Sequence, residues 1–373
     1  MKGTQSTNLG PLSGLLVLDV TRLLPGPVAS MILRSLGARV IKIETPTAPD
    51  LLRFLPPHEA GVNVCFRELN KGKESVVIDL YSEEGCAIFR RLCSRADVLL
   101  SSARKSWLEQ RGLGMKQLME QNDRLIACTL GSYRSDSPRE YQGGHDINFL
   151  ALSGLASLML DGQEKPIVPQ IQLADLGGAQ YCVISLLAAL LERERTGRGR
   201  ELHLSLEEGC DIYTLLARRL SGFATTSVGP LSGQSPVYRY YRCADEKFIA
   251  LGAIEPKFQK RLREIVALDT SDWPEDLFFT SNQTIHKQME ELFLSKDRAH
   301  WIDFFAGHDV CFSPVLGIDE VERDENFMRA HFPFEVENTV SALGGDTRSV
   351  LLEFGYSQSK IEEWVDSGRL IVG

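Results

Sequence analysis

The chain has 373 residues, a formal net charge of −9, 43% hydrophobic residues and 24% charged residues. Two domains are expected at this length, because single cores rarely grow beyond about 250–300 residues. The acidic balance argues against a general nucleic-acid binder, and no stretch approaches the ~18 uninterrupted apolar residues of a membrane span.

Strand and helix patterns alternate along the first 130 residues. Short apolar runs bounded by turn residues predict buried strands, and runs with helical apolar spacing lie between several of them. The predicted strands are 15–20, 40–44, 75–80, 97–102 and 124–130, and the predicted helices are 27–36 and 82–96. This alternation predicts an α/β fold with a Rossmann-like large domain and a parallel sheet. The first turn lacks Gly-x-Gly-x-x-Gly, so no dinucleotide site is predicted.

The second half of the chain starts with an apolar helix. Residues 177–193 are apolar almost all round, which predicts a helix that is buried or packed between subunits. A strand over 201–206 and a helix from 207 to about 221 follow. Residues 225–236 are rich in Gly, Ser and Pro, which is typical of a linker.

A smaller α+β domain is expected after this linker. Residues 238–254 read as two strands around a turn, and helical patterns follow to about residue 305. We therefore expect a large Rossmann-like domain over 1–224, completed by about 322–373, and a small domain over 237–321.

Cysteine usage and the terminal segments bear on location and metals. The eight cysteines contain no Cys-x-x-Cys pair and lie mostly in apolar runs. This pattern favours reduced core thiols over a zinc site or a disulfide framework, so no metal is expected. The first residues are polar and glycine-rich, unlike a secretory signal, and we expect a cytoplasmic protein.

Two short segments carry candidate chemistry. In GGHDIN (143–148), His145 and Asp146 stand at the predicted start of a helix, where the dipole favours negative charge and a developing oxyanion could be stabilised. A core or capping histidine is the alternative. In LADLGG (173–178), Asp175 precedes a glycine pair and the apolar helix, so it is either an N-cap or a carboxylate aimed at a pocket.

Basic residues gather between Arg22 and Lys73. This stretch holds eight basic residues and four acidic ones in an otherwise acidic chain. Such a local positive field suits a small polyanion. Chance clustering on a solvated surface is the alternative.

Several segments together resemble the family III coenzyme A transferase and racemase superfamily across nearly the whole chain. They are PLSGLLVLDVTRLLPGP, LGARVIKIE, LNKGKESVVIDL, GGHDIN, LADLGGA, TGRGRELHLSLEEG, YRCADEKFIALGAIEP and DVCFSPVL. Within the superfamily the sequence is most similar to the alpha-methylacyl-CoA racemases. Their Gly-His-Asp-Ile-Asn stands here at 144–148, and their Gly-Ala-Ile-Glu-Pro stands at 252–256.

The resemblance implies roles for four acid/base residues. His145 and Asp175 would flank the alpha carbon of an acyl-CoA substrate as the two bases, with Glu255 as an acidic partner and Asp146 beside the thioester oxygen. It also implies an interlocked homodimer, in which Glu255 could come from the second subunit. No cofactor is implied, because coenzyme A is part of the substrate.

Contacts to the coenzyme A phosphates are implied for Lys42, Lys71, Lys73 and Arg104. The sequence departs from the family in three places. SARKS (102–106) replaces an aromatic-Arg-Pro-Gly motif, GSYRSD (131–136) replaces a Gly-x-Gly-Gln turn near the thioester arm, and Phe149 stands where racemases often have Tyr. These departures bear on substrate range more than on reaction class.

Racemisation requires two bases of similar strength. Unperturbed pKa values of about 3.9 for Asp and 6.5 for His differ by ~2.6 units, or ~3.5 kcal/mol, and desolvation of Asp175 would narrow the difference. Two other functions stay open. One is a coenzyme A transferase with Asp175 as covalent nucleophile, and the other is a non-catalytic acyl-CoA binding protein.

Overall fold

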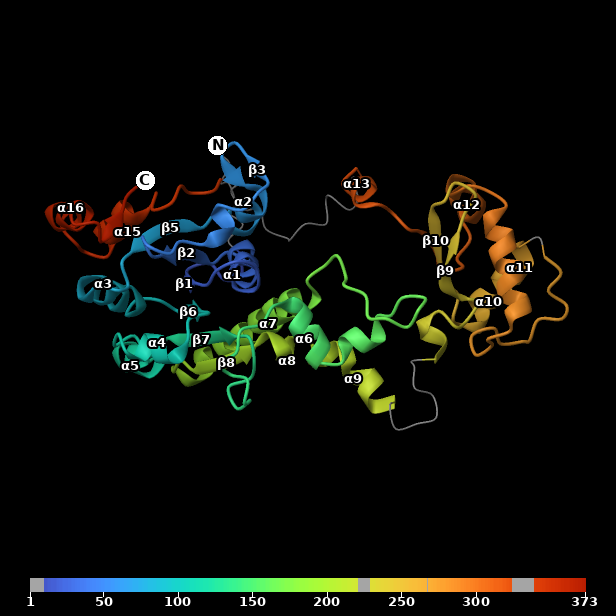
Figure 1. Ribbon diagram of the computed structural model, residues 1–373, viewed down its shortest axis with the longest axis horizontal. Helices are drawn as coiled ribbons and strands as arrows, with labels where there is room; N and C mark the ends of the chain where they lie inside the picture. Colours follow the sequence, from blue (N-terminus) through green and yellow to red (C-terminus); the bar gives the residue numbers. More distant parts are fainter. Residues whose placement is uncertain (1–9, 221–228, 267, 324–338) are drawn as a thin grey trace, which may run out of the picture. The chain divides into compact units, whose positions relative to one another are not determined.

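The computed structural model (Figure 1) describes residues 10–220, 229–266, 268–323 and 339–373. The chain separates into two compact units, residues 1–213 with 332–373 and residues 214–331. Each unit has its own hydrophobic core, and each is described by itself below.

A seven-stranded sheet runs through the described part of the first unit. In spatial order its strands are β12 (Leu370–Ile371), β5 (Glu74–Ile78), β2 (Arg39–Glu44), β1 (Leu16–Val20), β6 (Val98–Ser101), β7 (Ile126–Gly131) and β8 (Glu201–Ser205). Every neighbouring pair is parallel except β12 with β5. The predicted parallel sheet is confirmed. Its six parallel strands follow the Rossmann order, which reverses between β1 and β6.

Helices cover both faces of this sheet because its strands are apolar on both sides. Val17 belongs to the core under α1 (Pro25–Ser35) and α7 (Leu173–Thr196). Leu18, which points to the opposite face, belongs to the core of the other layer. That layer contains α3 (Glu83–Cys93), α4 (Lys105–Glu109), α5 (Met115–Gln121), α15 (Thr347–Glu353) and α16 (Gln358–Asp366). The Rossmann-like α/β class is therefore confirmed.

Helix α7 begins at Leu173, four residues before its predicted start, and ends where Gly197 adopts a left-handed conformation with φ 73°. Asp175 consequently lies inside the first turn of the helix rather than before it.

By length and composition α7 could cross a membrane, and half of its most apolar window is buried. A buried core helix gives the same composition. Ile184 and Leu191 on its outer side are each 64% exposed.

The predicted helix from 207 to about 221 is instead two helices, α8 (Leu206–Gly209) and α9 (Asp211–Leu220). Helices α6 (Asp146–Leu152), α7 and α8 lie side by side (Figure 1). A Cβ atom on Gly209 would stand 2.4 Å from the backbone nitrogen of Gly178. Gly209 and Gly178 therefore allow α8 to pack directly on the start of α7.

The second unit has a three-stranded antiparallel sheet in its described residues, in the order β11 (Phe312–Pro314), β10 (Phe248–Gly252) and β9 (Tyr238–Arg242). The predicted hairpin and the helices that follow it are present, which gives the expected α+β class. The helices are α10 (Pro256–Ile265), α11 (Gln283–Leu294), α12 (Arg298–Phe305) and α13 (Ile318–Val321). Residues 225–228 of the predicted linker lie outside the described residues, and Gly229–Ser232 forms a 3-10 turn.

Shorter elements complete the first unit. They are the hairpin of β3 (His58–Glu59) and β4 (Val62–Asn63), the helix α2 (Val64–Asn70), and 3-10 turns at Leu51–Arg53 and Leu155–Leu158. All eight cysteines lie in the described chain as free thiols; six are buried, as expected of core thiols, and Cys65 and Cys311 are exposed.

Candidate active site

His145, Asp146 and Asp175 come together where helices α6 and α7 begin. His145 is the N-cap residue of α6, and its backbone N–H donates to Asn148 Oδ1 at 3.0 Å. Its side chain is exposed. Asp175 is the third residue of α7 and is half-buried. Two helix starts thus place an imidazole and a carboxylate in one region of the first unit.

The side chain of Asp146 joins these two helices. Its Oδ1 accepts hydrogen bonds from the backbone N–H of Ala174 at 2.7 Å and of Asp175 at 3.1 Å. The first N–H groups of a helix have no intrahelical partner, so this carboxylate caps α7 from the first residue of α6. Oδ1 is therefore engaged within the protein. The expected place of Asp146 beside a thioester oxygen stays a prediction.

The electrostatics of Asp175 favour its protonated form. Burial and the negative charge of Asp146 together raise the pKa of Asp175 to about 6, and His145 opposes the rise. Desolvation is the dominant cause, as expected for a carboxyl group removed from water. Because Asp146 and His145 both shift this pKa, the three side chains lie close enough to interact electrostatically.

A cavity of about 660 Å³ lies beside this site, within the first unit. It opens at the carboxyl ends of β6 and β7, the edge at which doubly wound sheets bind ligands. Arg104 lines this cavity from the N-cap of α4 and is exposed, consistent with its expected contact to a phosphate. Gly143 lines the cavity two residues before His145. A ligand held near Arg104 could thus extend toward the histidine.

The cavity residues that the sequence did not single out include Lys105, Tyr133 and His203. Lys105 and Tyr133 lie shortly after the ends of predicted strands, and this position could have indicated them. His203 lies within β8, where its Nε2 is 3.0 Å from Glu201 Oε1. No local signal separates it from an ordinary strand residue.

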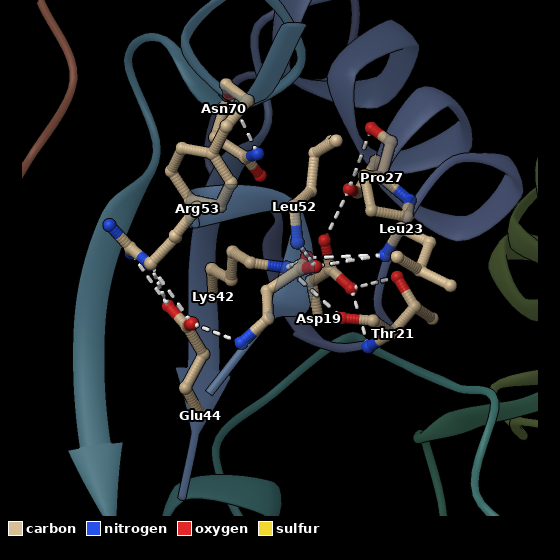
Figure 2. A network of polar contacts seen from close by, with 12 residues as sticks. Asp19, Thr21, Leu23, Pro27, Lys42, Glu44, Leu52, Arg53 and Asn70 are labelled. Atoms are coloured by element: carbon tan, nitrogen blue, oxygen red, sulfur yellow. Dashed lines mark hydrogen bonds and ion pairs between the residues drawn. The ribbon is translucent and has the colours of Figure 1, made fainter. Parts of the chain in front are cut away.

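Lys42 and Lys73 do not contact the surface, contrary to their expected role as phosphate ligands. Both are almost completely buried. Figure 2 shows Lys42 in a polar network that joins the ends of β1 and β2 to the start of α1. Lys42 Nζ lies 3.0 Å from Asp50 Oδ2 and donates to the carbonyl oxygen of Thr21 at 3.0 Å. Its charge is neutralised inside the protein, so it is not available to a ligand in solution.

Lys73 is held in the same way by Asp19, a charged residue within the apolar run of β1. Its Nζ lies 3.4 Å from Asp19 Oδ2 and donates to Ser30 Oγ at 2.7 Å and to Asn70 Oδ1 at 3.0 Å. Burial lowers the pKa of Lys73 to about 8, while Asp19 opposes the change. Lys73 is therefore paired inside the protein, near the carboxyl ends of β1 and β2. Lys71, in contrast, is partly exposed and paired with Glu68 at 2.8 Å.

Glu255 belongs to the second unit, whereas His145, Asp146 and Asp175 belong to the first. It is exposed at the N-cap of α10, and its side chain makes no capping hydrogen bond. Within the residues that the structure describes, no cluster of three or more His, Cys, Asp or Glu side chains could hold a metal ion.

The chain matches a family of known proteins over most of its length. The family model described as CoA-transferase family III matches residues 12–362. The chain is 32% identical to the alpha-methylacyl-CoA racemase of Homo sapiens over 96% of this chain and 97% of that protein. It is 28% identical to the acetyl-CoA:oxalate CoA-transferase of Acetobacter aceti, over 83% of this chain and 82% of that protein. A crystal structure of a CaiB/BaiF family protein from Brucella suis shares the fold, with a TM-score of 0.78 and 22% identity, covering 93% of this chain and all of that one.

Proposed function

This chain belongs to CoA-transferase family III, and on that basis we propose that it epimerises the alpha carbon of 2-methyl-branched acyl-CoA thioesters. The observation that carries the proposal is the pairing of His145 with Asp175, whose pKa is raised to about 6. Similarity to the human racemase over nearly both full lengths also supports it, although CoA-transferases are relatives too.

The proposed reaction moves a proton between the two faces of the alpha carbon. In one direction the Asp175 carboxylate removes the proton and a His145 imidazolium delivers another to the opposite face. In the other direction neutral imidazole removes the proton and the carboxylic acid delivers one. Because the two epimers are nearly equal in energy, the bases should be nearly equal in strength. The raised pKa of about 6 makes Asp175 a stronger base than an ordinary aspartate, which is the direction that this matching requires.

The raised pKa of Asp175 follows from how the two helices are joined. Capping by Asp146 keeps a second negative charge next to Asp175, and half-burial removes much of its water. The intermediate is an enolate, whose oxygen needs hydrogen-bond donors. The backbone N–H of Asp146, in the first turn of α6, is one such group, because helix geometry leaves it without an intrahelical acceptor.

Coenzyme A would lie along the cavity, with phosphates near Arg104 and the thioester near Gly143. No metal or additional cofactor takes part in the proposed reaction.

We also propose a homodimer. Exposed apolar residues on α7 and α9, including Ile184, Leu191 and Leu216, would be covered by a second copy. In an interlocked arrangement, the second subunit would supply Glu255.

The test is incubation of each epimer of a 2-methylacyl-CoA with the protein in heavy water, without an acid acceptor. Wild-type protein should exchange the alpha proton and interconvert the epimers. His145→Ala should abolish exchange from one epimer and Asp175→Asn from the other, and neither variant should interconvert them. The matched controls are His58→Ala and Asp123→Asn, exposed residues of the same unit that lie outside the cavity.

A CoA-transferase predicts a different pattern. In that reaction Asp175 attacks the thioester carbonyl and forms a covalent adduct. Asp175→Asn would then be inactive, His145→Ala would still move coenzyme A to a free acid, and hydroxylamine would trap the adduct. Detection of that adduct during turnover would exclude the racemase proposal.

A further inference from the structure

Tyr133 is a cavity residue for which the reaction proposed above has no role. It follows β7 in the segment GSYRSD, is only 6% exposed, and packs edge-on against Phe149 with ring centroids 5.3 Å apart. Both rings belong to the core beneath α6. The ring position is therefore fixed by packing, and the direction of the hydroxyl group is fixed with it.

The hydroxyl group lies directly against the backbone that leads into His145. A Cβ atom built on Gly144 would stand 2.7 Å from Tyr133 Oη and 2.8 Å from Phe149 Cε1. Any side chain at residue 144 would therefore displace one of the two rings. This close approach explains the second glycine of GGHDIN, and it brings a hydrogen-bond donor to within one residue of the candidate base.

Tyr133 Oη makes no hydrogen bond to any residue that the structure describes. The oxygen is not fully enclosed by the described part of the chain, and Tyr133 is one of the residues that line the cavity. A buried tyrosine hydroxyl normally finds a partner, so this one is placed to meet a ligand.

We infer that Tyr133 Oη donates a hydrogen bond to the thioester carbonyl oxygen of the bound acyl-CoA. The inference rests on the proposed function, which places an acyl thioester beside His145. When the alpha proton leaves, its electron pair delocalises onto this oxygen as the enolate forms, and the charge returns to carbon when a proton is delivered. A donor fixed in position stabilises that charge more strongly than it stabilises the neutral thioester.

The experiment compares Tyr133→Phe with wild type in the alpha-proton exchange assay, starting from each epimer. The variant keeps the ring that packs on Phe149 and removes only the hydroxyl group. We expect kcat to fall about 10²-fold, as for other oxyanion donors, with KM changed less than about threefold. The loss should be equal from both epimers, because the oxygen is common to both directions, whereas loss of either base affects one direction.

The matched control is Tyr81→Phe, which removes the hydroxyl of a tyrosine of the same unit that lies outside the cavity. Tyr81 is 56% exposed and does not adjoin Gly144, so its variant should keep wild-type kcat. Thermal unfolding gives an independent measurement. Removal of an unpartnered hydroxyl should leave the unfolding temperature of Tyr133→Phe unchanged or slightly higher, whereas a lower temperature would indicate an internal partner and overturn the inference.

Other outcomes are also decisive. Unchanged kcat, a rise in KM alone, or a loss from only one epimer would each overturn the role of Tyr133 while leaving the proposed function intact. A wild-type protein that exchanges no alpha proton would instead overturn the proposed function, and the Tyr133 assignment with it.

Discussion

Replacement of Asp175 by asparagine should stabilise the protein at alkaline pH. The aspartate has a folded-state pKa of about 6, above the unfolded value of about 3.9. It binds its proton more tightly in the folded state, so its contribution to stability is fully present below about pH 3.9 and is lost as pH rises through about 6. Above pH 7 the ionised carboxylate opposes folding, and asparagine removes that cost.

The size of the effect follows from the two pKa values. A difference of about 2 units corresponds to at most ~3 kcal/mol at 1.36 kcal/mol per unit. Asp175 is partly exposed, and solvent screening reduces this to roughly 1–1.5 kcal/mol. For a unit of this size, such a gain raises the unfolding temperature by about 2–5 °C.

The assay is thermal unfolding of wild type and Asp175→Asn across pH 4 to 8. The two proteins should unfold at similar temperatures near pH 4, and the variant should become progressively more stable as pH rises. Asp123→Asn, at an exposed position of the same unit, serves as control and should show no such trend. A variant that is less stable than wild type at pH 8, or a difference independent of pH, would refute the argument that Asp175 is held at an energetic cost.

Three further predictions concern residues around the site. Asp146→Asn keeps an oxygen to cap α7 but removes the charge, so the pKa of Asp175 should fall and the acid limb of the pH–rate profile should move to lower pH; an unmoved limb would contradict this. Lys73→Met should destabilise the protein by about 3–5 kcal/mol in urea unfolding, because it leaves a buried carboxylate unpaired, whereas Lys71→Met at the surface should change stability by less than about 0.5 kcal/mol. Arg104→Ala should raise KM for acyl-CoA about tenfold with little change in kcat, and equal KM values at low and high salt would argue against a phosphate contact.

The sequence alone determined the fold class and most of the larger elements. Strands buried on both faces appear as continuous apolar runs, and helices between them have apolar residues at helical spacing, so the alternation is visible locally. The two motifs around His145 and Asp175 were also visible, because glycine-flanked polar residues interrupt apolar runs there. Their closeness in space was implied only by resemblance to a family.

Only the tertiary structure decided which charged residues are buried and which face the cavity. Lys42, Lys71, Lys73 and Arg104 look alike in the sequence, yet two of them are enclosed in an internal network and one lines the cavity. The distinction depends on partners far away in the chain, such as Asp19, which is 54 residues from Lys73.

The detailed geometry of the site was likewise decided by long-range contacts. Asp146 caps the helix of Asp175 from 29 residues away, and the ring of Tyr133 reaches Gly144 across a loop. Local sequence propensity predicts each helix start separately and does not show which distant residues will contact it. The energy of an unpaired N–H or a buried carboxyl group depends on what the rest of the fold brings next to it, so burial and pairing follow from the assembled fold.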